Sequence, residues 1–281
     1  MHKAIGLILL CLAGVLAAAP LRLFVTIAPQ REIVQRIAGT EAQVTVLVPP
    51  GMSPESFSPD ARTLNALSKA DLFFTIGISC EDALLPKLRH LNRSLRVIAP
   101  AAGLSVRDFA PPGIGRDPHL WLDAGNIMVI ARQVADALSG ARPAESDGFA
   151  GRAQDYCRHV QEIDRQLSEL LRPLHGKSIL VYHPAFAYFL ERYGMRQLPI
   201  ELEGKEPPGG YLGQVIRQAK AEKCPVLFVQ PQVNERAVKA IAGELGCRTA
   251  VLDPLPQDIS SGLLEMGRTI SQAYDGKTGL Q

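Results

Sequence analysis

Four side chains of the kinds that bind metal ions are the strongest candidates for chemistry in this sequence. Two are histidines and two are acids that come after apolar runs; they are Glu55, His119, His183 and Asp253. Two imidazoles and two carboxylates make a complete ligand set for one divalent transition metal ion. Each side chain also has an ordinary interpretation, as a backbone-bonded histidine, a helix cap, a turn residue or a solvated acid. Because the four are far apart in sequence, only the fold can bring them together.

The surroundings of these residues leave some roles open and argue against others. Asp117 and Asp123 flank His119 in DPHLWLD, and either one could accept a hydrogen bond from its ring, although Asp123 is also placed to cap the next helix. Cys80 comes after an apolar run, and we expect it to pack rather than to bind metal. The sequence contains no HExxH motif, no CxxC pair and no P-loop. With a formal net charge of +2 and no basic patch, we expect no nucleic acid partner.

The elements that must position these side chains alternate in type along the chain. Short apolar runs are interleaved with helical patterns in two separate regions; the runs cover 21–27, 42–50, 71–77, 95–100, 178–183, 197–200, 226–230 and 249–253. Such alternation is typical of βαβ units, in which a parallel sheet is buried on both faces. Ligands of open parallel sheets lie beyond the carboxyl ends of the strands, where the four candidate side chains also fall.

A long helix is predicted between the two regions. From Ser146 to Leu174 apolar residues recur at spacings of three and four, which gives one stripe along a helix of about 26 residues and about 39 Å. We therefore predict an α/β protein with two parallel-sheet lobes. The N-terminal lobe covers 20–143, the linker helix 144–174 and the C-terminal lobe 175–281, with the metal site in the cleft between the lobes.

Residues 1–19 have the pattern of a secretory signal peptide. A positive start, MHK, precedes the apolar run AIGLILLCLAGVLA, which is too short to span a bilayer comfortably, and small residues follow. A membrane anchor is the alternative, but no second apolar span follows. The pattern predicts a mature protein in the periplasm.

Four cysteines remain after such a signal peptide is removed, and an oxidising compartment would allow them to pair. Cys224 and Cys247 each come just before an apolar run. If those runs form neighbouring parallel strands, the two thiols start close together and a bridge between them is plausible. Four buried thiols are the alternative, and both interpretations stay open.

The chain resembles the zinc/manganese solute-binding proteins of bacterial ABC importers, the helical-backbone metal-receptor family. The resemblance is carried, in order, by LVPPGMSPESFSPD, SKADLFFTIG, DPHLWLD, HPAFAYFLERYGM, ELEGKEPPGGYL, LFVQPQVNERAVKAIAGELG and VLDPL. It covers nearly all of the mature chain. It implies two α/β lobes joined by a long helix, one metal ion bound between them, and delivery of that ion to a membrane permease. We expect a monomer that is not an enzyme.

The resemblance also implies the ligands, position by position. The histidine of the family's DPHxWLD motif matches His119, the histidine that opens HxAFxYF matches His183, and the aspartate of the late LDP motif matches Asp253. The first ligand of the family is usually a histidine after PGxSP, and here that position is Glu55. This carboxylate makes the set harder, which favours manganese or iron, whereas HPAFAYF and EGKEP resemble zinc-type members. We expect one Zn²⁺ per chain, with Mn²⁺ or Fe²⁺ as the alternative.

Three alternative functions would use the same cleft. A metalloenzyme would require an open coordination position and a general base, and a closed tetrahedral set leaves no such position. A metal-free adhesin would follow if Glu55 had replaced a necessary ligand. A receptor for a metal chelate would call for aromatic or arginine side chains along the cleft, whereas four metal-type residues favour a naked ion.

Overall fold

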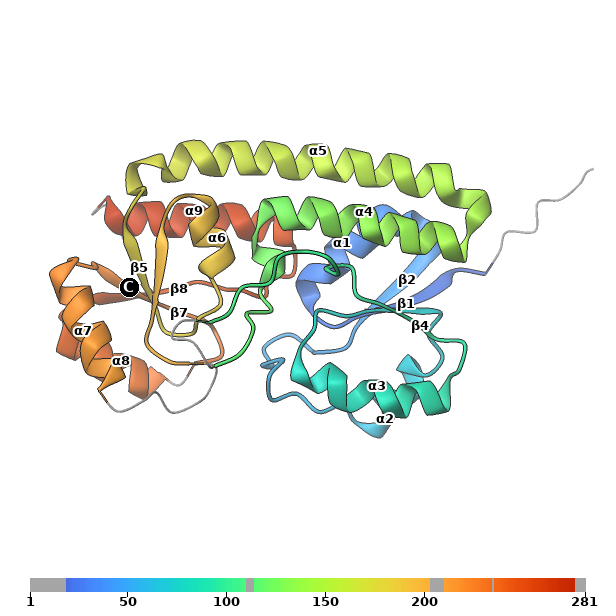
Figure 1. The fold of residues 1–281 in the computed structure, drawn as a ribbon, viewed down its shortest axis with the longest axis horizontal. Helices are drawn as coiled ribbons and strands as arrows, with labels where there is room; N and C mark the ends of the chain where they lie inside the picture. The colour runs from blue at the N-terminus through green and yellow to red at the C-terminus, as the bar shows by residue number, and fades with distance from the viewer. Residues whose placement is uncertain (1–18, 110–113, 203–209, 234, 276–281) are drawn as a thin grey trace, which may run out of the picture.

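The computed structural model describes residues 19–109, 114–202, 210–233 and 235–275. In these residues two four-stranded parallel sheets lie side by side, and a long helix runs along both of them (Figure 1). The predicted fold class is confirmed. The predicted signal peptide lies almost entirely outside the described residues, and no described helix has the length and apolar character required to cross a bilayer.

Both sheets have the same strand order. The N-terminal sheet has the order β2-β1-β3-β4 and the C-terminal sheet the order β6-β5-β7-β8. The strands of the first sheet are β1 (Leu21–Val25), β2 (Ala42–Val46), β3 (Leu72–Phe74) and β4 (Arg96–Ile98). Those of the second are β5 (Ser178–Val181), β6 (Arg196–Pro199), β7 (Val226–Val229) and β8 (Arg248–Val251). In each sheet the chain reverses its direction of winding after the second strand, which opens a crevice at the carboxyl edge.

Helices cover both faces of each sheet. The N-terminal sheet has α1 (Ala28–Ala38), α2 (Ala61–Leu67), α3 (Ser79–Leu91) and α4 (Ala124–Ala141) around it. The C-terminal sheet has α6 (Ala187–Arg192), α7 (Tyr211–Ala221), α8 (Glu235–Leu245) and α9 (Ile259–Tyr274). Asp123 caps α4 by accepting a hydrogen bond from the backbone N–H of Asn126 at 2.8 Å, so its predicted capping role is confirmed.

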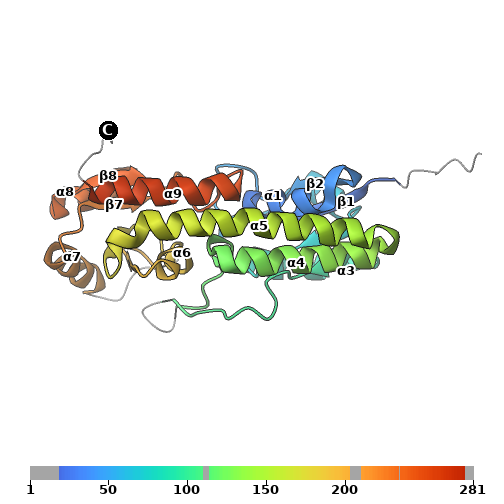
Figure 2. The same ribbon diagram turned by 90° about the horizontal axis from the view of Figure 1, so that it is seen from above.

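The linker helix is α5 (Ser146–Leu171), which has 26 residues and spans about 39 Å. Figure 2 shows it between α4 and α9, lying along both lobes. Its apolar stripe is buried and consists of Phe149, Ala153, Tyr156, Cys157, Val160, Ile163, Leu167 and Leu171. The stripe joins a hydrophobic core that also contains residues of β1, α1, α4, β5, α6 and α9, so the two lobes share one packed layer. From a shared core of this kind we expect limited rotation of one lobe against the other.

Several strands end earlier than the sequence predicts, although backbone hydrogen bonds to the neighbouring strand continue for a residue or two. The run predicted as 42–50 forms a strand only to Val46, yet the N–H groups of Leu47 and Val48 still bond to the β1 side, at 2.8 and 3.0 Å. In the same way β5 ends at Val181, and His183 lies two residues past that end rather than on it.

The cysteine alternatives are partly decided. Strands β7 and β8 are parallel neighbours, so Cys224 and Cys247 precede adjacent strands as expected. All four of the described cysteines are nevertheless free thiols, and the suspected bridge is not formed in this structure.

Candidate metal centre

Three of the four predicted ligands come together in the cleft. Among the described residues, Glu55, His119 and His183 each offer one ligand atom, and these atoms all lie within 4.8 Å of one another. Glu55 comes from the loop between β2 and α2, and His119 comes from the segment before the short turn Leu120–Leu122. His183 comes from the segment just past the carboxyl end of β5. The site is therefore assembled from both lobes, as the position of the strand ends predicts.

His119 is buried, with 2% of its surface exposed, and an acid holds its ring. Asp117 accepts hydrogen bonds from the backbone N–H of His119 at 3.0 Å and from its Nδ1 at 2.8 Å. A carboxylate oxygen that accepts from Nδ1 favours the tautomer of His119 in which Nδ1 carries the proton. Asp117 is thus the acceptor that the sequence left open between two aspartates. The indole of Trp121 lies beside the imidazole, with ring centroids 5.0 Å apart.

His183 is held in the same way from the other lobe. Its Nδ1 is hydrogen-bonded to Oε1 of Glu201, and its Nε2 lies 4.0 Å from Oε1 of Glu55. The rings of His119 and His183 lie edge to face with centroids 5.6 Å apart. Each histidine therefore has its Nδ1 on a carboxylate, an arrangement that fixes the orientation of the ring and is usual behind metal-binding histidines.

Glu201 was not predicted, although a signal for it exists in the strand register. Strands β5 and β6 pair in parallel with Val181 opposite Pro199, so His183 and Glu201 each lie two residues past that pair. Residues at equal distances beyond paired parallel strands emerge at the same edge of the sheet. The sequence alone does not predict the role of Glu201, because nothing in the two apolar runs indicates that they form neighbouring strands.

Glu55 is the most accessible of the three, with 37% of its side chain exposed. Its carboxylate accepts a hydrogen bond from the hydroxyl of Ser53 in the same loop. Together with His183 and Trp121 it lines a small cavity of about 10 Å³. A cavity of this volume has room for roughly one water-sized species, which suits a single ion. Gln230 and Gln232 also line this cavity.

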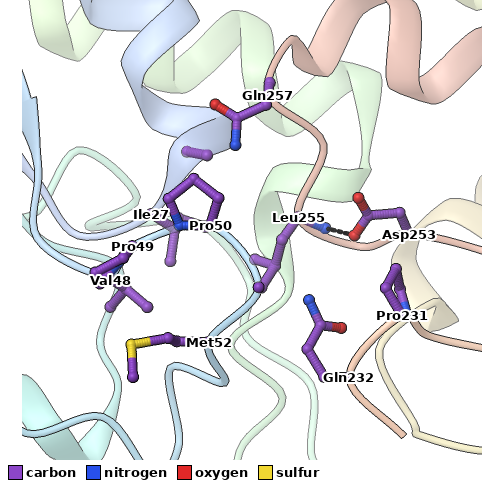
Figure 3. A pocket seen from close by; sticks show the side chains of 12 residues that line it. Ile27, Val48, Pro49, Pro50, Met52, Pro231, Gln232, Asp253, Leu255 and Gln257 are labelled. Atoms are coloured by element: carbon purple, nitrogen blue, oxygen red, sulfur yellow. Dashed lines mark hydrogen bonds between the residues drawn. The ribbon is translucent and has the colours of Figure 1, made fainter.

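Asp253 lies in a neighbouring cavity and outside the group of three ligand atoms. This cavity, of about 140 Å³, also has Gln232 and Leu255 in its wall. Figure 3 shows the carboxylate of Asp253 turned towards the backbone of Leu255, whose N–H donates to Oδ1 at 2.9 Å. Burial raises the pKa of Asp253, and the Leu255 hydrogen bond offsets part of that rise.

Cys80 does not belong to the group either. Burial, together with the charges of Glu81 and Glu55, raises the pKa of its thiol to about 11. A thiol with such a pKa is protonated at neutral pH, and the thiolate is the form that binds metals. The thiol lines a separate cavity together with Phe57 and Leu84, and its packing role stays a prediction.

Residues 23–273 match the family model described as "Zinc-uptake complex component A periplasmic". The chain belongs to this family. It is a family of solute-binding proteins and not of enzymes, which confirms the resemblance seen in the sequence. A His/His/Glu site in the cleft between two lobes is consistent with that membership.

Solved structures agree with the fold. A crystal structure of ZnuA has 31% sequence identity and a TM-score of 0.84, with 90% of this chain and 98% of that chain covered. A zinc-bound deletion mutant of ZnuA has the same identity and coverage with a TM-score of 0.86. FpvC from Pseudomonas aeruginosa in complex with Mn²⁺ has a TM-score of 0.77 at 21% identity, covering 92% of this chain and 100% of that chain, and shows likeness of fold alone.

Curated relatives bind two different metals. The zinc-binding protein AdcA of Streptococcus pyogenes serotype M3 is 23% identical over 92% of this chain and 54% of its own length. The manganese-binding lipoprotein MntA of Halalkalibacterium halodurans is 26% identical over 76% of this chain and 72% of its own length. This chain thus spans about half the length of the AdcA relatives that it matches.

Proposed function

We propose that the chain is an extracytoplasmic receptor that binds one Zn²⁺ ion and delivers it to an ABC permease. One observation carries the proposal: two buried imidazoles, each with Nδ1 bonded to a carboxylate, meet Glu55 so that one ligand atom of each of the three residues lies within 4.8 Å of the others. This arrangement suits capture of an ion better than a purely structural role, because two histidines with carboxylates behind them converge on a third acid, which is the pattern of a metal site. The family description, which names a zinc-uptake complex, supports the same function.

We propose Glu55, His119, His183 and Asp253 as the ligands. The first three already lie together, and Asp253 is to join them by exchanging its Leu255 hydrogen bond for the ion. Its cavity shares Gln232 and Leu255 with the cavity that Glu55 and His183 line, which supports this step. Two carboxylates would balance the charge of a dication, so a neutral site would form in the cleft.

Binding on this proposal is capture without chemistry. The ligands replace the water shell of the ion, and four protein ligands leave no open position for a reacting water. The imidazoles bind only in their neutral form, so we expect the affinity to fall as the pH becomes acidic. The shared core along α5 favours small movements of the lobes and ordering of the Glu55 loop.

The choice of metal follows from the ligand at position 55. A carboxylate in place of an imidazole shifts the preference towards harder ions, so Mn²⁺ and Fe²⁺ are the alternatives to Zn²⁺. Both preferences occur among the relatives, because AdcA is a zinc-binding protein and MntA a manganese-binding one. Zinc is proposed because the imidazole pair and the family description favour it.

The remaining parts of the proposal concern the whole protein. We propose a monomeric receptor with a signal peptide at 1–19, lobes at 20–143 and 175–281, and a linker at 144–174. The periplasmic family description supports the location. N-terminal sequencing of the protein exported by a bacterial host tests the signal peptide: a start between residues 18 and 20 is expected, and an uncleaved Met1 would contradict it.

The test of function is metal content. The mature protein is stripped with a chelator, equilibrated with equal trace zinc, manganese and iron, desalted and analysed by mass spectrometry. We expect one equivalent of zinc in the wild type and clearly less in Glu55→Ala. Glu169→Ala, which removes an exposed acid on α5, is the matched control and should match the wild type. Absence of retained metal in the wild type would overturn the proposal.

A further inference from the structure

The segment that carries His119 is fastened to the opposite lobe. Helix α6 follows His183 in the chain, and its Tyr188 reaches across to this segment. The phenol oxygen of Tyr188 accepts a hydrogen bond from the backbone N–H of Arg107 at 2.9 Å and donates one to the backbone carbonyl of Asp117 at 3.1 Å. One buried side chain thus ties both strands of the loop before His119 to the lobe that holds His183.

Arg107 connects Asp117 to the same lobe by a second route. Asp117 is fully buried and uses Oδ1 for His119, whereas its Oδ2 has no hydrogen-bond partner among the described residues. Nε of Arg107 lies 4.0 Å from that Oδ2, and the same guanidinium is ion-paired with Glu191 of α6. A buried carboxylate is costly without a nearby positive charge, and Arg107 is the charge that the structure supplies.

The far end of the same segment is held as well. Arg192 of α6 lies 3.2 Å from a carboxylate oxygen of Asp123, the residue that caps α4. It also makes two hydrogen bonds of 2.6 Å with Asp164 of α5. Tyr188 and Arg192 of α6 therefore hold the two ends of the stretch from Asp117 to Asp123.

The third ligand is held differently. Glu55 has its hydrogen bond with Ser53 in its own loop, and its side chain is far more exposed than either imidazole. Within this group of three, the two imidazoles are therefore held in place by other side chains, whereas Glu55 lies on a surface loop.

We infer that Tyr188 and Arg107 are positioning residues of the metal site. They fix Asp117, and through it His119, to the lobe that carries His183, so that the two imidazoles form a rigid half-site before the ion arrives. Glu55 and Asp253 are then the ligands that adjust to the ion. The inference rests on the proposed function, because it assigns a role in metal binding to residues that touch no ion.

The test compares conservative variants by zinc affinity and by the visible spectrum of the cobalt-substituted protein. Tyr188→Phe removes one hydroxyl and keeps the ring, and Arg107→Met removes the charge. We expect each to weaken zinc binding about tenfold, as loss of groups behind metal ligands does, and to shift the cobalt bands. Arg107→Lys keeps a positive charge beside Asp117 and should restore most of the affinity, which a purely structural role would not predict.

The matched control is Tyr274→Phe. Tyr274 also donates its hydroxyl proton to a backbone carbonyl, that of Ser178, but at the start of β5, away from the site. It should bind zinc like the wild type. If the wild type binds one zinc and Tyr188→Phe and Arg107→Met match it in affinity and spectrum, the inference is overturned and the proposed function stands. If the wild type binds no metal, both are overturned.

Discussion

Replacing Glu201 with glutamine should weaken metal binding and leave the fold intact. Glu201 accepts a hydrogen bond from Nδ1 of His183, and its backbone N–H is anchored to the carbonyl of Tyr182 at 3.0 Å. Glutamine keeps the length of the side chain and can still accept through its amide oxygen, but it carries no charge. Loss of a carboxylate behind a metal-bound histidine typically costs 10–100-fold in affinity, or about 1.4–2.7 kcal/mol. The side chain is partly exposed, so the free energy of unfolding should fall by less than about 1 kcal/mol.

The assay is competition of the apo protein with a chromophoric zinc chelator at neutral pH, with thermal unfolding of the apo protein measured in parallel. Glu222→Gln is the matched control, because Glu222 is an acid of the same lobe that faces Arg196 at 3.7 Å, beside the starting ends of the strands. It should bind zinc like the wild type. An unchanged affinity in Glu201→Gln would refute the claim that the His183–Glu201 pair prepares a ligand.

Three further results are expected. Trp121 is the only tryptophan and packs against His119, so its emission should change on zinc addition and saturate at one equivalent; a flat titration would contradict the location of the site. Burial pushes the pKa of Asp164 upward, but the hydrogen bond and charge of Arg192 outweigh it and lower that pKa. The resulting stabilisation is present above the ordinary value of 3.8 and is lost as the pH falls through the folded value. The stability difference between wild type and Arg192→Met, followed by urea unfolding, should therefore shrink in acid, and a constant difference would argue against the pair. Leu167→Ala should cost about 2–5 kcal/mol, since this side chain is fully buried, and a loss below 1 kcal/mol in the same assay would contradict a shared core.

Much of the architecture follows from local patterns. The alternation of apolar runs and helical stripes predicts two parallel sheets, and the stripe from Phe149 to Leu171 predicts the linker helix, because both depend on residues close in sequence. Asp123 as a cap is equally local. The candidate ligands follow from one further rule, that side chains past the carboxyl ends of parallel strands meet at one edge.

What escaped prediction depends on the order of the strands and on contacts between lobes. Glu201 meets His183 only because β6 is the neighbour of β5, and the sequence does not state that order. The contact of Tyr188 with the backbone of Arg107 joins residues 81 positions apart, and nothing local marks either one. Asp253 follows its strand as predicted, yet the orientation of its side chain is set by the N–H of Leu255.

X-ray absorption spectroscopy of the zinc-loaded mature protein tests the central claim most directly, because it reads the ligand atoms around the ion. A site made of Glu55, His119, His183 and Asp253 predicts two imidazole nitrogens and carboxylate oxygens at about 2.0–2.2 Å, with no sulfur. Removal of either histidine should remove one imidazole from the spectrum. A sulfur neighbour at about 2.3 Å, or a shell without two imidazoles, would contradict the account.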